Sequence, residues 1–209
     1  MEGIKLLDHT AELIRATEGR PTLVIADAAR VCKDGAGNGD YCAARKLCRK
    51  LLDWGHMSPF EFFEVTFACT TNRAVSHELV RHRLASYMQE SQRYCNYEQE
   101  LSVICPHGVK AAGQEALGNW EAQMFEAWDC YCGLLERGVK AEDARTVLPE
   151  ATATKILVKM NLREFRHFLS LRSTPVAWYE MRLLATAMAD AYLARFPDEQ
   201  YLVREIVNG

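Results

Sequence analysis

Two stretches of the chain alternate between apolar and polar positions with a period of two. The first runs from Glu61 to Cys69 and places on one face Phe63, Val65, Phe67 and Cys69. The second runs from Thr152 to Val158. Such alternation in β-favouring residues predicts strands with one buried face. Two shorter apolar runs, Pro21–Ala26 and Ser102–Cys105, predict short buried strands.

Elsewhere apolar residues recur at intervals of three and four, which predicts amphipathic helices. The clearest helix begins at Tyr41 and ends at Gly55. Asn161, followed by Glu164 three residues later, resembles a helix start with a capping pair. Further helices are predicted at about 72–83, at about 111–137, and from near Pro175 to Phe196.

The predicted strands and helices show no regular β-α-β alternation. We therefore expect an α+β fold with a mostly antiparallel sheet flanked by long helices. No stretch rich in Pro or Ser divides the chain, and no internal repeat is visible. The 209 residues are thus expected to form a single domain, 1–209.

Composition narrows the class of protein. With 25 basic and 28 acidic side chains the formal net charge is −3, which argues against a protein that coats nucleic acid. The sequence shows no signal peptide and no long apolar run, so a cytoplasmic protein without membrane contact is expected. The eight cysteines are then expected to be small apolar core residues without disulfides.

Two short motifs carry little weight as functional signals. The Gly-rich stretch from Gly35 to Gly39 lacks the rest of either nucleotide-binding fingerprint and predicts a turn. Cys130 and Cys132 lie two residues apart in a predicted helix, where their side chains diverge, so shared metal ligation is disfavoured. We expect no metal site.

The strongest chemical signal is a basic and polar cluster from Arg81 to Tyr94, which holds three arginines, one histidine and one acidic residue. Successive helical residues are about 100° apart. Arg81, His82 and Arg83 therefore either point to different groups or lie where a helix unwinds into a loop. Guanidinium groups among Ser and Gln side chains suit phosphate and carbonyl oxygens, although a solvated helix end is the plainer interpretation.

Four ordered blocks favour a binding role, because together they resemble the flavin-dependent thymidylate synthases. Arg81-His-Arg, seven residues and Ser91 match the signature R-H-R-x7-S. Segments beginning at Gly55, Ala144 and Asn161 resemble that family's G-H-x-[ST]-P-F-E, A-R-x-V-L-P and N-x-R-x-x-x-H-F-x-x-L-R. Four blocks in the family's order are far more specific than any single one.

The resemblance implies an enzyme that converts dUMP to dTMP by reductive methylation. Methylenetetrahydrofolate would donate the carbon, and NADPH would supply reducing equivalents through bound FAD. The family's active sites form at subunit interfaces of a homotetramer, so we expect dUMP as substrate partner and a homotetramer here.

The resemblance also assigns residues by matching position. The expected FAD contacts are Ser58, Arg81, His82, Arg83, Gln89, Asn161, Arg163 and His167. The expected dUMP contacts are Glu78, Arg81, Gln89, Glu90, Ser91, Gln92, Arg93, Arg145 and Arg172. His56 falls at a position expected to support flavin and folate chemistry, and Arg172 at one expected to stabilise the uracil ring as N3 loses its proton. The position of Glu78 varies between acid and amide in the family.

Some of these residues make sense on physical grounds alone. Arg172 lies seven residues after Phe165, on the apolar stripe of its predicted helix, so it needs a partner unless it reaches water. Arg163 and His167 are four residues apart and share the polar face of that helix. Ser91 is assigned to binding dUMP, since no Asp-His pair that could activate it is identifiable.

Two positions depart from the family pattern: Met88 stands where a polar residue is common, and Cys32 where serine is frequent. Either could alter local flavin or phosphate contacts.

The alternative function from another class is a basic-cleft module that binds nucleotides or single-stranded nucleic acid. It would use Arg81, Arg83 and Arg93, with stacking on Tyr87 and Tyr94. A non-catalytic relative is a third reading, disfavoured by the retention of Ser91, Arg145 and Arg172.

Overall fold

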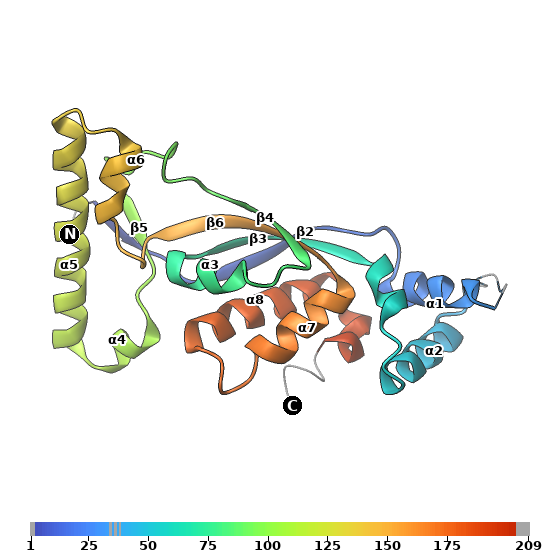
Figure 1. The fold of residues 1–209 in the computed structure, drawn as a ribbon. Coiled ribbons are helices and arrows are strands. Elements are labelled where there is room, and N and C mark those ends of the chain that lie inside the picture. Colours follow the sequence, from blue (N-terminus) through green and yellow to red (C-terminus); the bar gives the residue numbers. More distant parts are fainter. Residues whose placement is uncertain (1–2, 34, 36, 38, 204–209) are drawn as a thin grey trace.

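A four-stranded antiparallel sheet forms the centre of the computed structural model, which describes residues 3–33, 35, 37 and 39–203 (Figure 1). The strand order is β2 (Thr10–Ala16), β3 (Glu64–Asn72), β6 (Ala153–Asn161) and β4 (Ala85–Gln89). β3 and β6 pair along their whole length, from Glu64 opposite Asn161 to Asn72 opposite Ala153. The two strands that the alternating pattern predicts are therefore the central pair of the sheet.

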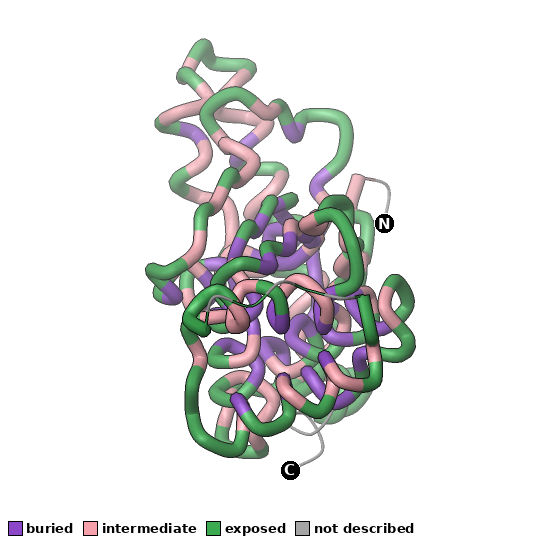
Figure 2. Tube along the Cα trace, turned by 90° about the vertical axis from the view of Figure 1, so that its right-hand side faces the viewer, coloured by how far each residue is buried: buried purple, intermediate pink, exposed green. Residues whose placement is uncertain are grey.

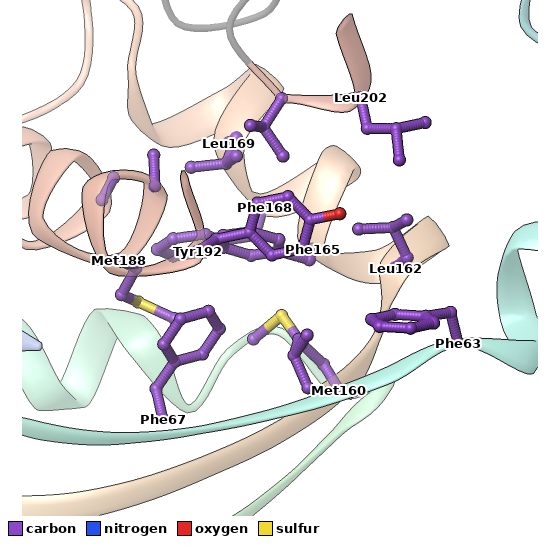
Figure 3. Packing of buried hydrophobic residues seen from close by; sticks show 14 of the residues in the cluster. Phe63, Phe67, Met160, Leu162, Phe165, Phe168, Leu169, Met188, Tyr192 and Leu202 are labelled. Carbon is purple, nitrogen blue, oxygen red and sulfur yellow. The ribbon is translucent and has the colours of Figure 1, made fainter. Parts of the chain in front are cut away.

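One face of the sheet is covered by α3 (Arg73–Leu79), α7 (Leu162–Arg172) and α8 (Tyr179–Arg195), while Figure 1 shows no helix on the opposite face. The main core lies between the sheet and these helices, where Phe67 and Met160 of the strands meet Phe165 and Tyr192 (Figure 3). Each fully buried large apolar side chain contributes roughly 1.5–3 kcal/mol. This packing fixes α3 and α7, which carry much of the candidate site.

The start of α7 follows the sequence signal. Asn161 has an extended backbone, and its side chain accepts a hydrogen bond of 2.9 Å from the backbone N–H of Glu164. This arrangement satisfies one of the donors that a helix start leaves unpaired. The predicted helix start at Asn161 is confirmed.

The predicted strand at Pro21–Ala26 is wrong, because these residues form the first turns of α1 (Pro21–Val31). Pro21 occupies the first turn, where a missing N–H costs nothing, and Ile25 and Ala26 are fully buried. A short apolar run cannot by itself distinguish a strand from a buried helix. α1 packs against α2 (Tyr41–Asp53), whose predicted helix is confirmed, and against a 3-10 turn, η1 (Ser58–Phe62).

A second, smaller core lies at the other end of the molecule. The helix predicted at about 111–137 is confirmed as α5 (Gln114–Glu136). A separate short helix, α4 (His107–Ala111), precedes it, and Gly113 between them has a φ of 101° that helical residues do not adopt. Met124 and Tyr131 of α5 are buried there. The remaining elements of this end are β1 (Ile4–Leu6), its parallel partner β5 (Leu101–Val103), α6 (Ala141–Ala144) and η2 (Arg145–Val147).

The predicted α+β class with a mostly antiparallel sheet is confirmed. Figure 2 shows the buried segments concentrated in the middle and lower part of the molecule, while its upper part is mostly exposed or intermediate. A last 3-10 segment, η3 (Pro197–Leu202), closes the main core. Within the described residues no helix has the length and apolar character needed to cross a membrane.

Two smaller predictions need qualification. All eight cysteines are free, but only Cys48, Cys69 and Cys105 are buried, so core packing does not explain the exposed Cys32, Cys42 and Cys130. The turn predicted around Gly35–Gly39 lies partly outside the described residues, which omit 34, 36 and 38.

Candidate active site

The segment from Arg81 to Tyr94 is a turn followed by a strand. α3 ends at Leu79, and β4 begins at Ala85 and pairs with β6, with Gln89 opposite Ile156. In the turn His82 is buried, 7% exposed, whereas Arg81 and Arg83 are exposed. The three side chains therefore have different surroundings, as expected if they do not all face one ligand. The helix predicted at 72–83 is shorter than expected.

His82 lies in a chain of polar contacts that joins three separate segments. Its Nδ1 is 3.3 Å from Oε1 of Glu164 on α7, and its Nε2 accepts a hydrogen bond of 3.0 Å from Nε of Arg172. Arg172 also donates from Nη1 to Oε2 of Glu78 on α3, at 2.9 Å. Arg172 thus has the partners that its place on an apolar stripe requires, and the structure brings Glu78, His82 and Arg172 together.

Burial and neighbouring charge keep His82 neutral. Burial lowers the pKa of His82, the nearby Arg172 guanidinium lowers it further, and Glu164 opposes both effects. A guanidinium Nε can only donate a hydrogen bond, so the Nε2 that faces it must carry a lone pair. The proton of the neutral ring is then on Nδ1, directed at the carboxylate of Glu164.

A polar pocket of about 420 Å³ gathers most of the expected dUMP residues from β4 onward. Gln89, Glu90, Ser91 and Gln92 line one side, and Arg145 of η2 lines another. Nε of Arg145 donates to the backbone oxygen of Glu142 at 3.1 Å. The pocket therefore joins the block that begins at Arg81 with the block that begins at Ala144, and its residues from the two blocks lie more than fifty positions apart in the sequence.

Two basic residues of this pocket are absent from the sequence prediction: Arg73 and His77. Nη2 of Arg73 donates to the backbone oxygen of Glu90 at 3.0 Å, while its Nε is buried without a hydrogen-bond partner. His77 lies 3.5 Å from Glu150 at the exposed rim. A signal was available, because Arg73, His77 and Arg81 recur every four residues and would share one face of the helix predicted at about 72–83.

Internal hydrogen bonds hold the end of β4 in place. Gln89 donates from Nε2 to Oγ of Ser76 at 2.9 Å, and Glu90 accepts at Oε1 from the hydroxyl of Tyr97 at 3.1 Å. Both residues also line a groove of about 740 Å³ on the sheet face that no helix covers. The polar pocket therefore opens beside a broad groove across β2, β3 and β6.

Arg93, also expected at dUMP, does not line the pocket in this structure. Its Nε is 2.7 Å from Oε2 of Glu142, and its guanidinium lies over the exposed Tyr94 ring. Tyr87 is half-buried, and its hydroxyl donates to the backbone oxygens of Leu79 and His82. Tyr87 is thus engaged in the fold, which argues against the nucleic-acid module that would stack bases on it.

Several of the expected flavin residues lie around the exposed start of α7, whereas Gln89 lines the polar pocket. Arg163 and His167 are both exposed on its polar face, as predicted from their spacing. Nη1 of Arg163 is 2.6 Å from Oε1 of Glu61 in η1, which links the block that begins at Gly55 with the block that begins at Asn161. His56 and Ser58 are exposed in the same region, and the His167 ring lies 6.2 Å from the His82 ring.

Residues 12–198 match the model of the family described as thymidylate synthase complementing protein. The chain belongs to this family. A flavin-dependent thymidylate synthase from Geobacter sulfurreducens is 38% identical over 192 residues, which cover 88% of this chain and 79% of that protein. One from Thermococcus kodakarensis is 45% identical over 145 residues, covering 68% of this chain and 59% of that protein. The family expected from the four sequence blocks is confirmed, and with it an enzyme of the methyltransferase class.

A solved structure shares the fold across the whole chain. The UMP/dUMP methylase PolB from Streptomyces cacaoi, bound with 5-Br dUMP, superposes with a TM-score of 0.84 at 25% identity. The match covers 98% of this chain and 99% of that chain. The thymidylate synthase complementing fold therefore extends from the small core around α5 to the helices on the sheet.

The two departures from the family pattern lie at the surface. Met88 is 72% exposed and lines the groove on the uncovered sheet face. Cys32 is exposed at the end of α1. Their effects on flavin or phosphate contacts stay predictions.

Proposed function

We propose that this chain catalyses the reductive methylation of dUMP to dTMP, with methylenetetrahydrofolate as carbon donor and NADPH as reductant through bound FAD. The observation that carries the proposal is the polar pocket, which presents Arg73 and Arg145 beside Ser91 and Gln92. Membership of the family and the likeness to a methylase bound with 5-Br dUMP support it. A cytoplasmic, single-domain enzyme stays our prediction.

The pocket suits the phosphate of dUMP, which carries close to two negative charges. Two guanidinium groups can donate paired hydrogen bonds to phosphate oxygens, and the Ser91 hydroxyl and Gln92 amide complete the shell. A hydrogen bond to a charged group contributes about 1.5–3 kcal/mol. In this proposal Ser91 binds the substrate and forms no covalent bond with it.

Arg172 acts on the pyrimidine ring. Its partners Glu78 and His82 hold the guanidinium by two donors, so its other N–H groups can face the uracil carbonyls and N3. When N3 loses its proton, the fixed positive charge stabilises the anion, whose electron density makes C5 nucleophilic. The side chain does this without moving, since its partners fix it beforehand.

The side chains present fit a flavin dinucleotide. Arg81, Arg83 and Arg163 are exposed cations that could pair with a pyrophosphate. The other expected contacts are Ser58, His82, Gln89, Asn161 and His167. Both ring nitrogens of His82 are engaged within the chain, so its contact with FAD would come from ring carbons. FAD, when bound, would supply hydride transfer from NADPH, and His56 would support the flavin and folate.

A homotetramer with shared active sites completes the proposal. The groove beside the polar pocket lies on a sheet face without helices, and Met88 and Leu157 are exposed there as neighbours on β4 and β6. Such an exposed apolar face is typical of an interface. A second copy on this face would close the groove over Gln89 and Glu90.

Release of tritium from 5-tritiated dUMP tests substrate and reaction together. Purified protein with FAD, NADPH and methylenetetrahydrofolate is expected to release tritium and form dTMP, and omission of NADPH or methylenetetrahydrofolate should stop dTMP formation. The protein is expected to be yellow, with flavin absorbance bleached by NADPH. A colourless protein that binds no added FAD and forms no dTMP would overturn the proposal.

A further inference from the structure

Glu164 is a buried carboxylate that no expected substrate or cofactor contact explains. It is 4% exposed and lies in the first turn of α7, where its own backbone N–H is bonded by Asn161. Its Oε1 lies 3.3 Å from Nδ1 of His82, eighty-two residues earlier in the chain. A buried carboxylate is costly unless it accepts hydrogen bonds, and the Nδ1–H of His82 is the side-chain donor that this contact supplies.

The contact has a consequence at the other side of the imidazole ring. Since Nε of Arg172 donates to Nε2 of His82 at 3.0 Å, His82 must hold its proton on Nδ1. The other tautomer would point an N–H at the N–H of Arg172. A carboxylate can accept a hydrogen bond but cannot donate one, so Glu164 favours the tautomer with the proton on Nδ1. This is the tautomer that Arg172 needs.

We propose that Glu164 is a positioning residue, which fixes the His82 tautomer and thereby the orientation of Arg172. This inference rests on the proposed function, in which Arg172 stabilises the pyrimidine. Two of the five N–H groups of Arg172 are used by His82 and Glu78, which leaves three in a fixed plane for the substrate. Without Glu164, His82 can hold its proton on Nε2 instead of Nδ1. The guanidinium of Arg172 then loses one of its two hydrogen-bond partners.

The surroundings of His82 limit how else its ring could be held. From α7 it faces Glu164, His167, Arg172 and the Phe168 ring at 5.1 Å. From β4 the Tyr87 hydroxyl contacts its backbone oxygen, and from α3 Glu78 acts through Arg172. Glu164 is the carboxylate in hydrogen-bond contact with the ring among the described residues.

The tautomer can be measured directly by ¹⁵N NMR of histidine-labelled protein, with the His82 signals identified by their loss in His82→Gln. Wild type is expected to show Nδ1 protonated and Nε2 unprotonated. Glu164→Gln keeps an oxygen that can accept the same proton, so the tautomer should persist. Glu164→Leu removes the acceptor and should shift His82 toward the Nε2–H form. A wild-type Nε2–H ring, or an unchanged tautomer in Glu164→Leu, would overturn the proposal.

Kinetics then test whether the tautomer matters for the reaction. Because small misplacements of a catalytic group cost up to about 100-fold, kcat/KM for dUMP should fall about 10- to 100-fold in Glu164→Leu. Glu164→Gln should restore most of the activity. Ser170→Ala, on the exposed side of the same helix, controls for a change in α7 and should match wild type.

The experiments distinguish a failure of the proposed function from a failure of the positioning role of Glu164. If wild type forms no dTMP, the proposed function fails while the NMR result still reports on Glu164. If dTMP forms and Glu164→Leu, folded by circular dichroism and loaded with FAD, turns over like wild type, the positioning role fails. Equal loss in Glu164→Leu and Glu164→Gln, with the tautomer kept in both, would likewise contradict it.

Discussion

At the scale of single residues, the site is built from charges that the fold compensates. Arg172 is partly buried at the end of α7, with its side chain 23% exposed, and a charge in such a place is costly unless it is paired. Glu78 and His82 supply its partners from a different part of the chain. Arg73 differs, because its buried Nε has no partner while Nη2 is bonded to the backbone of Glu90. Arg172 is thus oriented in advance, and Arg73 retains donor capacity.

Replacement of Arg172 by Ala is expected to lower kcat for dTMP formation by about 10²–10³-fold, as for loss of a donor that stabilises transition-state charge. FAD should still bind, which flavin absorbance can check. Arg172→Lys keeps the charge but not the planar set of donors, so it should restore only part of the activity. Unchanged turnover in Arg172→Ala would remove the proposed role.

Replacement of Arg73 by Gln is expected to raise KM for dUMP about 10- to 100-fold, because a charge-assisted bond contributes about 1.5–3 kcal/mol. Binding of deoxyuridine, which lacks the phosphate, should not change. Lys110→Gln is the matched control, since it also removes one positive charge but lies on α4 outside the pocket. An equal loss of affinity for dUMP and deoxyuridine would show that Arg73 does not contact the phosphate.

At the scale of elements, α3 and α7 each connect two parts of the site. α3 carries Arg73 and His77 in the polar pocket and Glu78 beside Arg172. α7 carries Glu164 near its start and Arg172 at its end, both directed at His82. The geometry around His82 therefore depends on how firmly the first turn of α7 is held.

The Asn161 cap is the local interaction that holds this turn. Asn161→Ala is expected to lower the free energy of unfolding by about 0.5–2 kcal/mol, as urea denaturation can measure. Asn161→Ser keeps a side-chain oxygen that can cap the helix, so its stability should stay close to that of wild type. If the Ala and Ser variants were equally stable, the hydrogen bond to Glu164 would not stabilise the helix start.

At the scale of the whole molecule, the sheet is covered on one side only. Leu157 of β6 is 41% exposed on the uncovered face and is paired in register with Met88 on β4 and Ala68 on β3. This row of apolar side chains borders the groove that adjoins the polar pocket. The assembly proposed above would bury it.

Leu157→Arg should therefore disrupt the homotetramer, because a charge buried without a partner opposes association. Size-exclusion chromatography with light scattering would show smaller species than wild type and, with the shared site lost, low dTMP formation. Val31→Arg makes the same kind of change at an exposed position of α1 and should leave assembly intact. If the Leu157→Arg variant remained a tetramer, the interface would have to lie on another face of the molecule.

Two buried histidines make stability sensitive to acid. Burial lowers the pKa of both His9 and His82 below the ordinary 6.5, against the opposing carboxylates Glu180 and Glu164. The unfolded chain then binds more protons, so the free energy of unfolding should decrease as pH falls from about 6.5 toward the lowered values. Each histidine contributes at most about 1.4 kcal/mol per pH unit.

Urea denaturation across this pH range measures the effect. His9→Gln can keep hydrogen bonds to Thr71 and Glu180 without titrating, so it should flatten the slope. Glu199 acts in the opposite direction, because burial raises its pKa above 4.5. The folded chain then binds more protons at this residue than the unfolded chain, so its contribution to the free energy of unfolding falls as pH rises. A stability that does not change between pH 7 and 5.5 in a Glu199→Gln background would contradict the assignment to the histidines.

The sequence alone determined the parts of this protein that depend on near neighbours. Alternation predicted β3 and β6, Asn161 and Glu164 predicted the start of α7, and the four blocks predicted the family. These signals survive because strand alternation and helix capping act over two to four residues. The candidate dUMP residues from Gln89 to Gln92 and Arg145 do meet in one pocket, although their roles stay predictions.

Only the tertiary structure decided which distant residues meet. The apolar run at Pro21 is helical because it packs against α2, and β4 is a strand because β6 offers its edge. Glu164 could not be linked to His82 from sequence, since eighty-two residues separate them and no local rule brings them together. Packing of α3 and α7 onto one sheet face fixes that contact, and with it the orientation of Arg172.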